Sequence, residues 1–106
     1  YQRQHLIPYS TRNHALFQRS GMGINGASNM MYLPVAPGVD PNPLKGLHNG
    51  WTAEHADYNR MVNRELDQLE SLARSQKWDY RRVQQEVVAL QTRLRDGFNT
   101  GRLTCA

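Results

Sequence analysis

Residues 48–59, HNGWTAEHADYN, are the stretch of this chain whose residue types and spacing best suit chemistry. Thr52 is predicted to be a helix N-cap, because its hydroxyl can accept hydrogen bonds from the free amides of a first turn. His55 then lies in that turn, and Asn59, four residues on, shares its helix face. An imidazole and an amide oxygen at this spacing can hold one divalent ion or contact one phosphate. On spacing alone, two surface residues on a polar helix face are the simpler interpretation.

Two short strands are predicted ahead of this helix. The first covers residues 2–8, QRQHLIP, in which two aliphatic residues favour an extended chain, a proline ends it, and His5 lies on it or at its edge. Residues 11–19 fit one or two helical turns. The second strand covers residues 28–35, SNMMYLPV, with Asn29 at its start.

A loop and two long helices complete the predicted elements. Residues 36–50 contain three prolines and three glycines, which predicts a loop. Apolar residues at steps of three and four predict helices over residues 52–75 and 78–96, with Gly97 and Gly101 as stop signals. The short connection between these helices predicts an antiparallel hairpin. The expected fold class is therefore α+β, mostly helical.

Composition and charge limit the classes of function. The 106 residues suffice for one domain with a modest core. The net charge is +4, and eleven of the thirteen basic residues are arginine, which suits bidentate contact with phosphate. The single cysteine, Cys105, excludes an intrachain disulfide and a cysteine-based zinc site. No membrane span or signal peptide is visible, and the start at Tyr1 leads us to expect part of a longer protein.

Three segments, in this order, resemble the AHH family of bacterial polymorphic-toxin nucleases in the HNH/endonuclease VII superfamily. They are QHLIP at residues 4–8, GINGASNMMYLP at residues 23–34, and the histidines His48 and His55 followed by Tyr58-Asn59. The site of that superfamily is a ββα-metal finger. The resemblance implies one domain, with a ββα-metal core over residues 1–60 and a C-terminal helical hairpin and tail over residues 61–106.

The resemblance implies metal-assisted cleavage of a phosphodiester bond. His5 would be the general base, because an imidazole titrates near neutrality and can take a proton from an attacking water. Asn29 would fix the loop and orient His5. The implied metal ligands are His55, His48, Gln4 and Asn59, and the implied substrate contacts are Arg3, Arg60 and Arg64.

One position departs from the family pattern. Where the family has an Ala-His-His triplet, this chain has Arg3-Gln4-His5, so the first histidine, an expected metal ligand, is replaced by Gln4. An amide oxygen suits Mg²⁺ better than a transition metal, which makes Mg²⁺ the expected ion and leaves Zn²⁺, Ni²⁺ and Mn²⁺ open. A substitution that disarms a toxic protein and a natural variant with weakened catalysis both stay open. The spacing from His48 to His55 also exceeds the compact family pattern, so the two need not bind one ion.

The resemblance further implies the C-terminal toxin domain of a larger secreted or injected effector. It would cut DNA, or RNA, with low sequence specificity in the cytoplasm of a competing cell, and an acidic immunity protein would block its basic surface. The alternatives are a non-catalytic module that binds a protein through the helical hairpin, and a nucleic-acid binder that does not cleave. Three separated segments in the right order favour the nuclease. Convergence of the His5 and His55 imidazoles is the geometric test.

Overall fold

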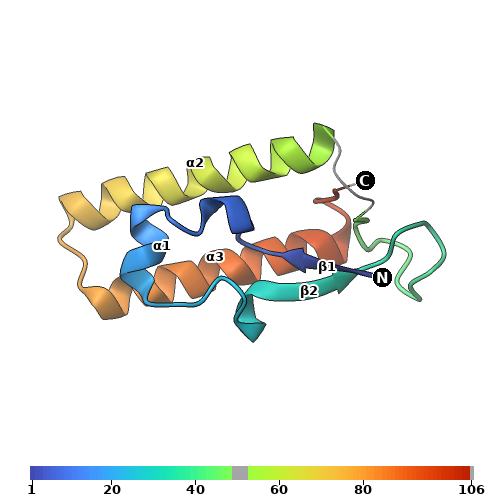
Figure 1. The fold of residues 1–106 in the computed structure, drawn as a ribbon, viewed down its shortest axis with the longest axis horizontal. Helices are drawn as coiled ribbons and strands as arrows, with labels where there is room; N and C mark the ends of the chain where they lie inside the picture. Colours follow the sequence, from blue (N-terminus) through green and yellow to red (C-terminus); the bar gives the residue numbers. More distant parts are fainter. Residues whose placement is uncertain (49–52, 106) are drawn as a thin grey trace.

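The computed structural model describes the backbone of residues 1–48 and 53–105, and the side chains of residues 1–48 and 56–105. The elements, in chain order, are β1 (Gln2–His5), the 3₁₀ turn η1 (Tyr9–Thr11), α1 (Ala15–Ser20), the 3₁₀ turn η2 (Ala27–Asn29), β2 (Met30–Leu33), α2 (Ala53–Ser75) and α3 (Tyr80–Thr100). The two long helices account for most of the regular structure, and a small sheet lies beside them (Figure 1). The predicted α+β, mostly helical fold class is confirmed.

The sheet consists of β1 and β2, which pair antiparallel. Gln4 lies opposite Met31, and both side chains are buried, whereas Arg3 and its partner Tyr32 are exposed. This is the alternation expected of strands that cover a core with one face. Both strands are shorter than predicted, because a 3₁₀ turn replaces the start of the second and the chain leaves the first after His5.

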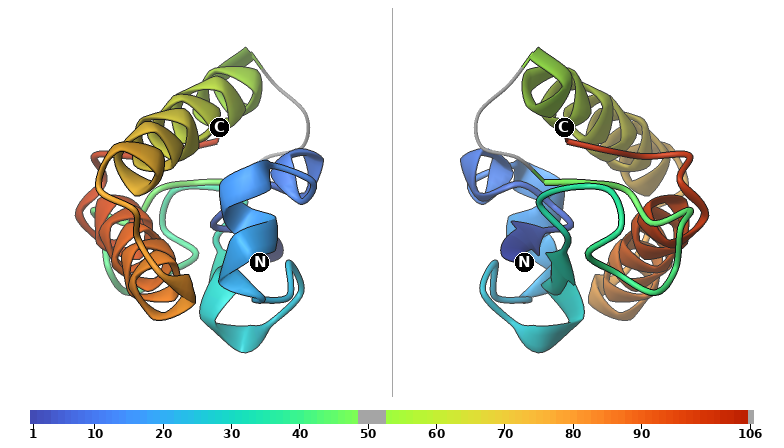
Figure 2. Two further views of the ribbon diagram at one scale, coloured as in Figure 1. Left: turned by 90° about the vertical axis from the view of Figure 1, so that its left-hand side faces the viewer. Right: turned by 90° about the vertical axis from the view of Figure 1, so that its right-hand side faces the viewer.

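The long helices run antiparallel and are joined by a short connection, as predicted, and α1 packs against both of them (Figures 1 and 2). Their inward stripes are buried and form one core with α1 and the sheet. Asp79 caps α3 by accepting a hydrogen bond from the Arg82 amide at 2.8 Å. The predicted N-cap of α2, Thr52, lies outside the described residues.

The helix end predicted at Gly97 is wrong, because α3 continues to Thr100. Gly101 ends the helix with a left-handed φ of 79°. Gly97 is instead buried within the helix, where an added Cβ would lie 2.5 Å from the side chain of Leu103. Its small size therefore makes room for the chain that follows α3.

Residues 101–105, here called the C-terminal tail, fold back toward the first turns of α2 (Figure 2). The Cys105 amide donates to the Leu47 carbonyl at 2.7 Å, and the Leu47 amide donates to Thr104 Oγ1 at 3.0 Å. The His48 amide donates in turn to the Pro34 carbonyl at 3.0 Å. The backbone at His48 is thus held between the end of β2 and the C-terminal tail.

In the described part of the chain, no helix is long and apolar enough to cross a membrane.

Candidate active site

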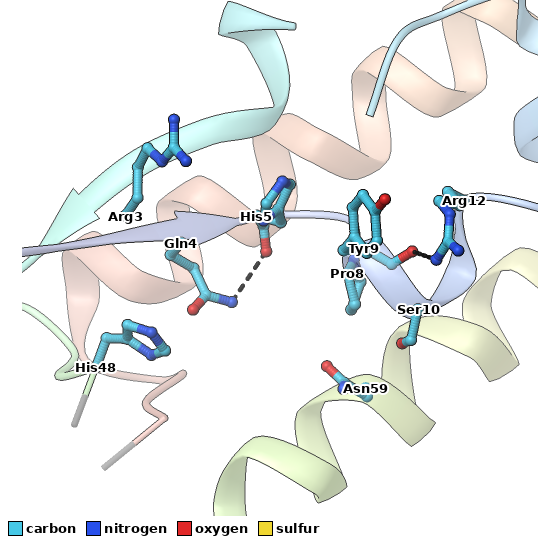
Figure 3. Close-up of a pocket in the computed structure, with 9 residues that line it drawn as sticks. All are labelled: Arg3, Gln4, His5, Pro8, Tyr9, Ser10, Arg12, His48 and Asn59. Atoms are coloured by element: carbon cyan, nitrogen blue, oxygen red, sulfur yellow. Dashed lines mark hydrogen bonds between the residues drawn. The ribbon is translucent and has the colours of Figure 1, made fainter. Parts of the chain in front are cut away.

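A pocket of about 360 Å³ opens beside β1, where it meets η1, the loop at residue 48 and the first turns of α2. Its lining is formed by Arg3, Gln4, His5, Pro8, Tyr9, Ser10, Arg12, His48 and Asn59 (Figure 3). Five residues predicted for the site therefore border one cavity: Arg3, Gln4, His5, His48 and Asn59.

Gln4 is placed in the pocket by the alternation of β1. Its side chain is 2% exposed and lies on the same side of the strand as His48 and Asn59 (Figure 3). Its Nε2 donates to the His5 carbonyl at 2.9 Å. The Gln4 amide oxygen points toward His48 in Figure 3 and accepts no hydrogen bond from a described residue. The oxygen is therefore oriented toward whatever occupies the pocket.

Asn59 supplies a second amide oxygen from α2. Its Oδ1 is buried and has no hydrogen-bond partner among the described residues. A buried oxygen left without a partner costs about 1–3 kcal/mol, so a group that bonds Asn59 Oδ1 would be stabilised in the pocket. A cation or a water held by the pocket would supply that partner.

The pocket residues fit a hard divalent cation. Two amide oxygens and the imidazole of His48 border the cavity, and oxygen-rich sets suit Mg²⁺ better than late transition metals. No cluster of three or more histidine, cysteine, aspartate or glutamate side chains occurs among the described residues, so a carboxylate-rich cage is not part of the described pocket. His55 lies one helical turn before Asn59 on α2, but its side chain is outside the described residues.

His5 borders the same pocket, but its ring projects from the opposite side of β1 to Gln4 (Figure 3). His5 Nε2 lies 2.8 Å from Asn25 Oδ1, and the ring centroid lies 5.8 Å from that of Tyr9. With the amide of Asn25 in this orientation, Nε2 carries the proton, because a carbonyl oxygen only accepts. Nδ1 then keeps the lone pair that a general base requires. The predicted convergence of His5 with His55 lies outside what the described residues can show.

Asn29 is not part of the pocket lining. It is fully buried, and its Oδ1 accepts from the Ile7 amide at 2.8 Å. Its Nδ2 donates to the carbonyls of Ile7 and Ile24 at 3.0 and 2.8 Å, and the Leu6 amide donates to the Asn29 carbonyl at 2.8 Å. These bonds fix the chain that follows His5, whereas the orientation of His5 by Asn29 stays a prediction.

Tyr58 is a second support that the sequence argument did not single out. Its hydroxyl donates to the carbonyl of Leu6, and its ring packs against Phe98 at a centroid distance of 5.2 Å. Burial raises the pKa of the Tyr58 phenol well above its usual range. The bond ties α2, one residue before Asn59, to the chain one residue after His5. The adjacency of Tyr58 to Asn59 was the available signal.

The rim of the pocket holds Tyr9 and Arg12, which were not predicted as site residues. The Arg12 guanidinium lies 4.1 Å from the centroid of the Tyr9 ring, and its Nη1 donates to the Tyr9 carbonyl at 3.0 Å. The three-residue spacing across η1 brings the two together. A tyrosine and an arginine three residues apart after Pro8 were visible in the sequence, but only the turn places them at the pocket.

The remaining predicted residues lie near the pocket or away from it. Arg60 and Arg64 line an adjoining hollow on α2, and Arg60 forms an ion pair with Asp57. The His14 ring accepts from the Leu16 amide at the start of α1 and bonds Asp67 at 2.7 Å.

Comparison with known proteins was made for sequence families, curated proteins and solved structures. A family described as a nuclease family of the HNH/ENDO VII superfamily with a conserved AHH matches residues 1–94. The pocket and the match together define a nuclease domain, whose substrate is nucleic acid. The chain belongs to the AHH family. Nucleases of this superfamily generally use divalent metal ions. No curated protein and no solved structure gave a significant match.

Proposed function

We propose that this domain is a divalent-metal-dependent endonuclease that hydrolyses DNA phosphodiester bonds. One observation carries the proposal: the amide oxygens of Gln4 and Asn59, from separate elements, border one pocket with His48 and have no described hydrogen-bond partner. A nuclease of this superfamily needs ligand atoms in such a place, whereas a binding module does not.

The residues of the pocket suit the roles that hydrolysis requires. Gln4, His48 and Asn59 would hold a divalent ion, which would offset the charge on the leaving oxygen. His55 would join them, since it shares a helix face with Asn59. His5 would take the proton of the attacking water through Nδ1, while Asn25 holds Nε2. Arg3, exposed at the rim, would contact the phosphate.

We also propose the biological setting. The domain would be the C-terminal toxin of a larger secreted or injected effector that acts in the cytoplasm of a competing cell. Its sequence specificity would be low, because no base-reading motif is present. The net charge of +4 supports an acidic immunity protein as the partner that blocks it in the producing cell.

A second candidate is an inactivated nuclease, which Gln4 favours as the replacement of the conserved first histidine. Plasmid digestion by the purified protein separates the two. The proposal expects cleavage that EDTA abolishes and that Mg²⁺, Mn²⁺, Ni²⁺ or Zn²⁺ restores. Binding of plasmid without cleavage under any of these ions would support the inactivated form.

We predict that His5→Ala lowers the cleavage rate about a hundredfold to ten-thousandfold, the usual effect of removing a general base. Gln2→Ala, at an exposed position of the same strand, is the control and should cut at the wild-type rate. Equal rates for His5→Ala and wild type at matched metal would exclude His5 as the base.

The ligand assignments are tested without reference to activity. Calorimetric titration with Mn²⁺ or Mg²⁺ should show weaker binding by His55→Ala and by His48→Ala than by wild type, since each removes an imidazole. Gln85→Ala, exposed on α3, should bind as wild type does. Unchanged affinity in either histidine variant would remove that histidine from the ligand set.

A further inference from the structure

A second hollow, of about 450 Å³, adjoins the pocket along α2. Its lining, here called the flanking groove, is formed by Ser10, Thr11, Asn59, Arg60, Asn63 and Arg64. Ser10 and Asn59 border both cavities, so the flanking groove continues the pocket toward the middle of α2.

The lining of the flanking groove suits an anion. All six residues are polar, two are arginines and none is acidic. Ser10 and Asn63 are exposed, so their hydroxyl and amide groups can donate hydrogen bonds.

The two arginines of the groove differ in what they already bind. Arg60 forms an ion pair with Asp57, whereas Arg64 has no acidic partner among the described residues. The other described carboxylates of α2 are engaged elsewhere: Glu65 with Arg93, Asp67 with His14, and Glu70 with Arg74. The charge of Arg64 is therefore available to a ligand in the groove.

Asn59 and Arg64, five residues apart on α2, both line the flanking groove, and Asn59 also borders the pocket. A nucleic-acid strand whose scissile phosphate lies in the pocket can therefore continue along the groove, where the long side chain of Arg64 can contact the next phosphate.

We infer that the flanking groove is a phosphate subsite, which binds through Arg64 the phosphate next to the scissile one in a polynucleotide. The inference rests on the proposed function and deepens it, because it makes the substrate a chain with at least two consecutive phosphates. A small diester without a neighbouring phosphate uses the pocket alone. Arg64 contributes to the selection of polynucleotides and leaves the chemistry at the pocket unchanged.

The test compares Arg64→Gln with Arg81→Gln, a matched control that removes the same charge. Arg81 is exposed in the first turn of α3 and has no acidic partner among the described residues. Each variant is measured on a short single-stranded oligonucleotide and on bis(p-nitrophenyl) phosphate, which has one phosphate. Arg64→Gln should lower kcat/KM for the oligonucleotide about tenfold, as expected for one charge-assisted contact, and leave the diester unchanged. Arg81→Gln should leave the ratio of the two rates at the wild-type value.

Binding of the same oligonucleotide in EDTA gives a readout that does not depend on cleavage. The slope of log K against log salt should become shallower by about 0.7 in Arg64→Gln, the value for one lost phosphate contact on a single strand, and stay unchanged in Arg81→Gln. Equal loss on both substrates, or binding identical to wild type, would overturn the subsite. If wild type cuts neither substrate, the proposed function fails, and the binding comparison still decides the subsite.

Discussion

The sequence resemblance aligns Gln4 with the first histidine of the family's Ala-His-His triplet, and the buried amide of Gln4 faces His48 and Asn59. We predict that Gln4→His binds Zn²⁺ and Ni²⁺ more tightly than wild type, because imidazole is a better ligand for late first-row metals than an amide oxygen. Calorimetric titration measures this, with Gln85→His as the control that adds an imidazole to the exposed face of α3.

The accompanying rates separate the interpretations of Gln4. If Gln4→His cleaves much faster than wild type, Gln4 is a substitution that disarms or weakens the nuclease. A shift of metal preference without gain in the Mg²⁺-supported rate would mark Gln4 as a Mg²⁺-compatible ligand. Unaltered affinity, preference and rate would show that residue 4 is not a ligand.

Asn29 holds the chain after His5 through bonds that water cannot replace. We predict that Asn29→Ala lowers the free energy of unfolding by roughly 3–5 kcal/mol, because the buried Ile7 amide and two carbonyls lose their partners. Urea unfolding measures the loss, and the exposed Asn13→Ala should change stability little. Unchanged stability would contradict the structural role of these bonds, and full cleavage by the folded variant would contradict the positioning of His5.

At the scale of single residues, sequence spacing predicted the pocket in part. The resemblance named Gln4, His5, His48 and Asn59 together, and the structure places all four around one pocket, while their roles stay predictions. The partner of His5 could not, because Asn25 reaches it through the turn that precedes η2. That the ring of His5 and the amide of Gln4 project from opposite sides of β1 follows from the alternation of a strand, whereas the pairing with β2 decides which of the two sides faces the core.

At the scale of elements, the loop before α2 packs tightly against the C-terminal tail. A Cβ added at Gly46 would lie 2.0 Å from the Leu103 carbonyl oxygen, so the tail must move. We predict that Gly46→Ala lowers the free energy of unfolding by about 1–3 kcal/mol and weakens divalent-metal binding, because the backbone at His48 loses its support.

The control for this prediction is Gly23→Ala, whose added methyl would meet nothing closer than 4.0 Å. Thermal unfolding and metal titration of both variants measure the effect. If Gly46→Ala binds metal like wild type despite lower stability, the C-terminal tail supports the fold but not the site.

Cys105, in the C-terminal tail, gives this contact a pH dependence. Burial raises the pKa of the Cys105 thiol to about 12, whereas an unfolded thiol titrates near pH 8.5. Between these values the folded state binds more protons than the unfolded state, so the free energy of unfolding falls as pH rises. We predict that this fall, measured with EDTA between about pH 9 and 10, is smaller in Cys105→Ala. Identical slopes for the two proteins would contradict a buried neutral thiol.

The helices could be predicted from the sequence because their cores repeat at regular steps, as the stripe from Tyr58 to Ala73 shows. Gly97 misled the prediction because glycine commonly ends helices, and its real partner, Leu103, comes from the chain beyond the helix. The pairing of the C-terminal tail with Leu47 joins residues far apart and carries no local pattern. Long-range contacts of this kind fix the backbone position of a site residue such as His48.

For the whole molecule, one core joins both long helices to the sheet, so stability and the site depend on the same packing. We predict that Leu66→Ala and Leu90→Ala each lower the free energy of unfolding by about 2–5 kcal/mol, because both side chains are buried. Leu72→Ala, 42% exposed on the same helix as Leu66, should cost much less. Urea unfolding gives these values, and cleavage per folded molecule should stay at the wild-type level in all three variants. A specific loss of cleavage at full folding would place the mutated leucine in the chemistry.

The order of synthesis determines when the contact between the C-terminal tail and Leu47 can form. Thr104 and Cys105 follow every described helix and strand, yet the Thr104 hydroxyl accepts from the Leu47 amide and the Cys105 amide donates to the Leu47 carbonyl, beside His48. A nascent chain that has not passed Cys105 therefore contains β1, β2 and α2 without the contact that secures the loop between them. The backbone at Leu47, next to His48, is therefore secured only after the C-terminal tail has been synthesised.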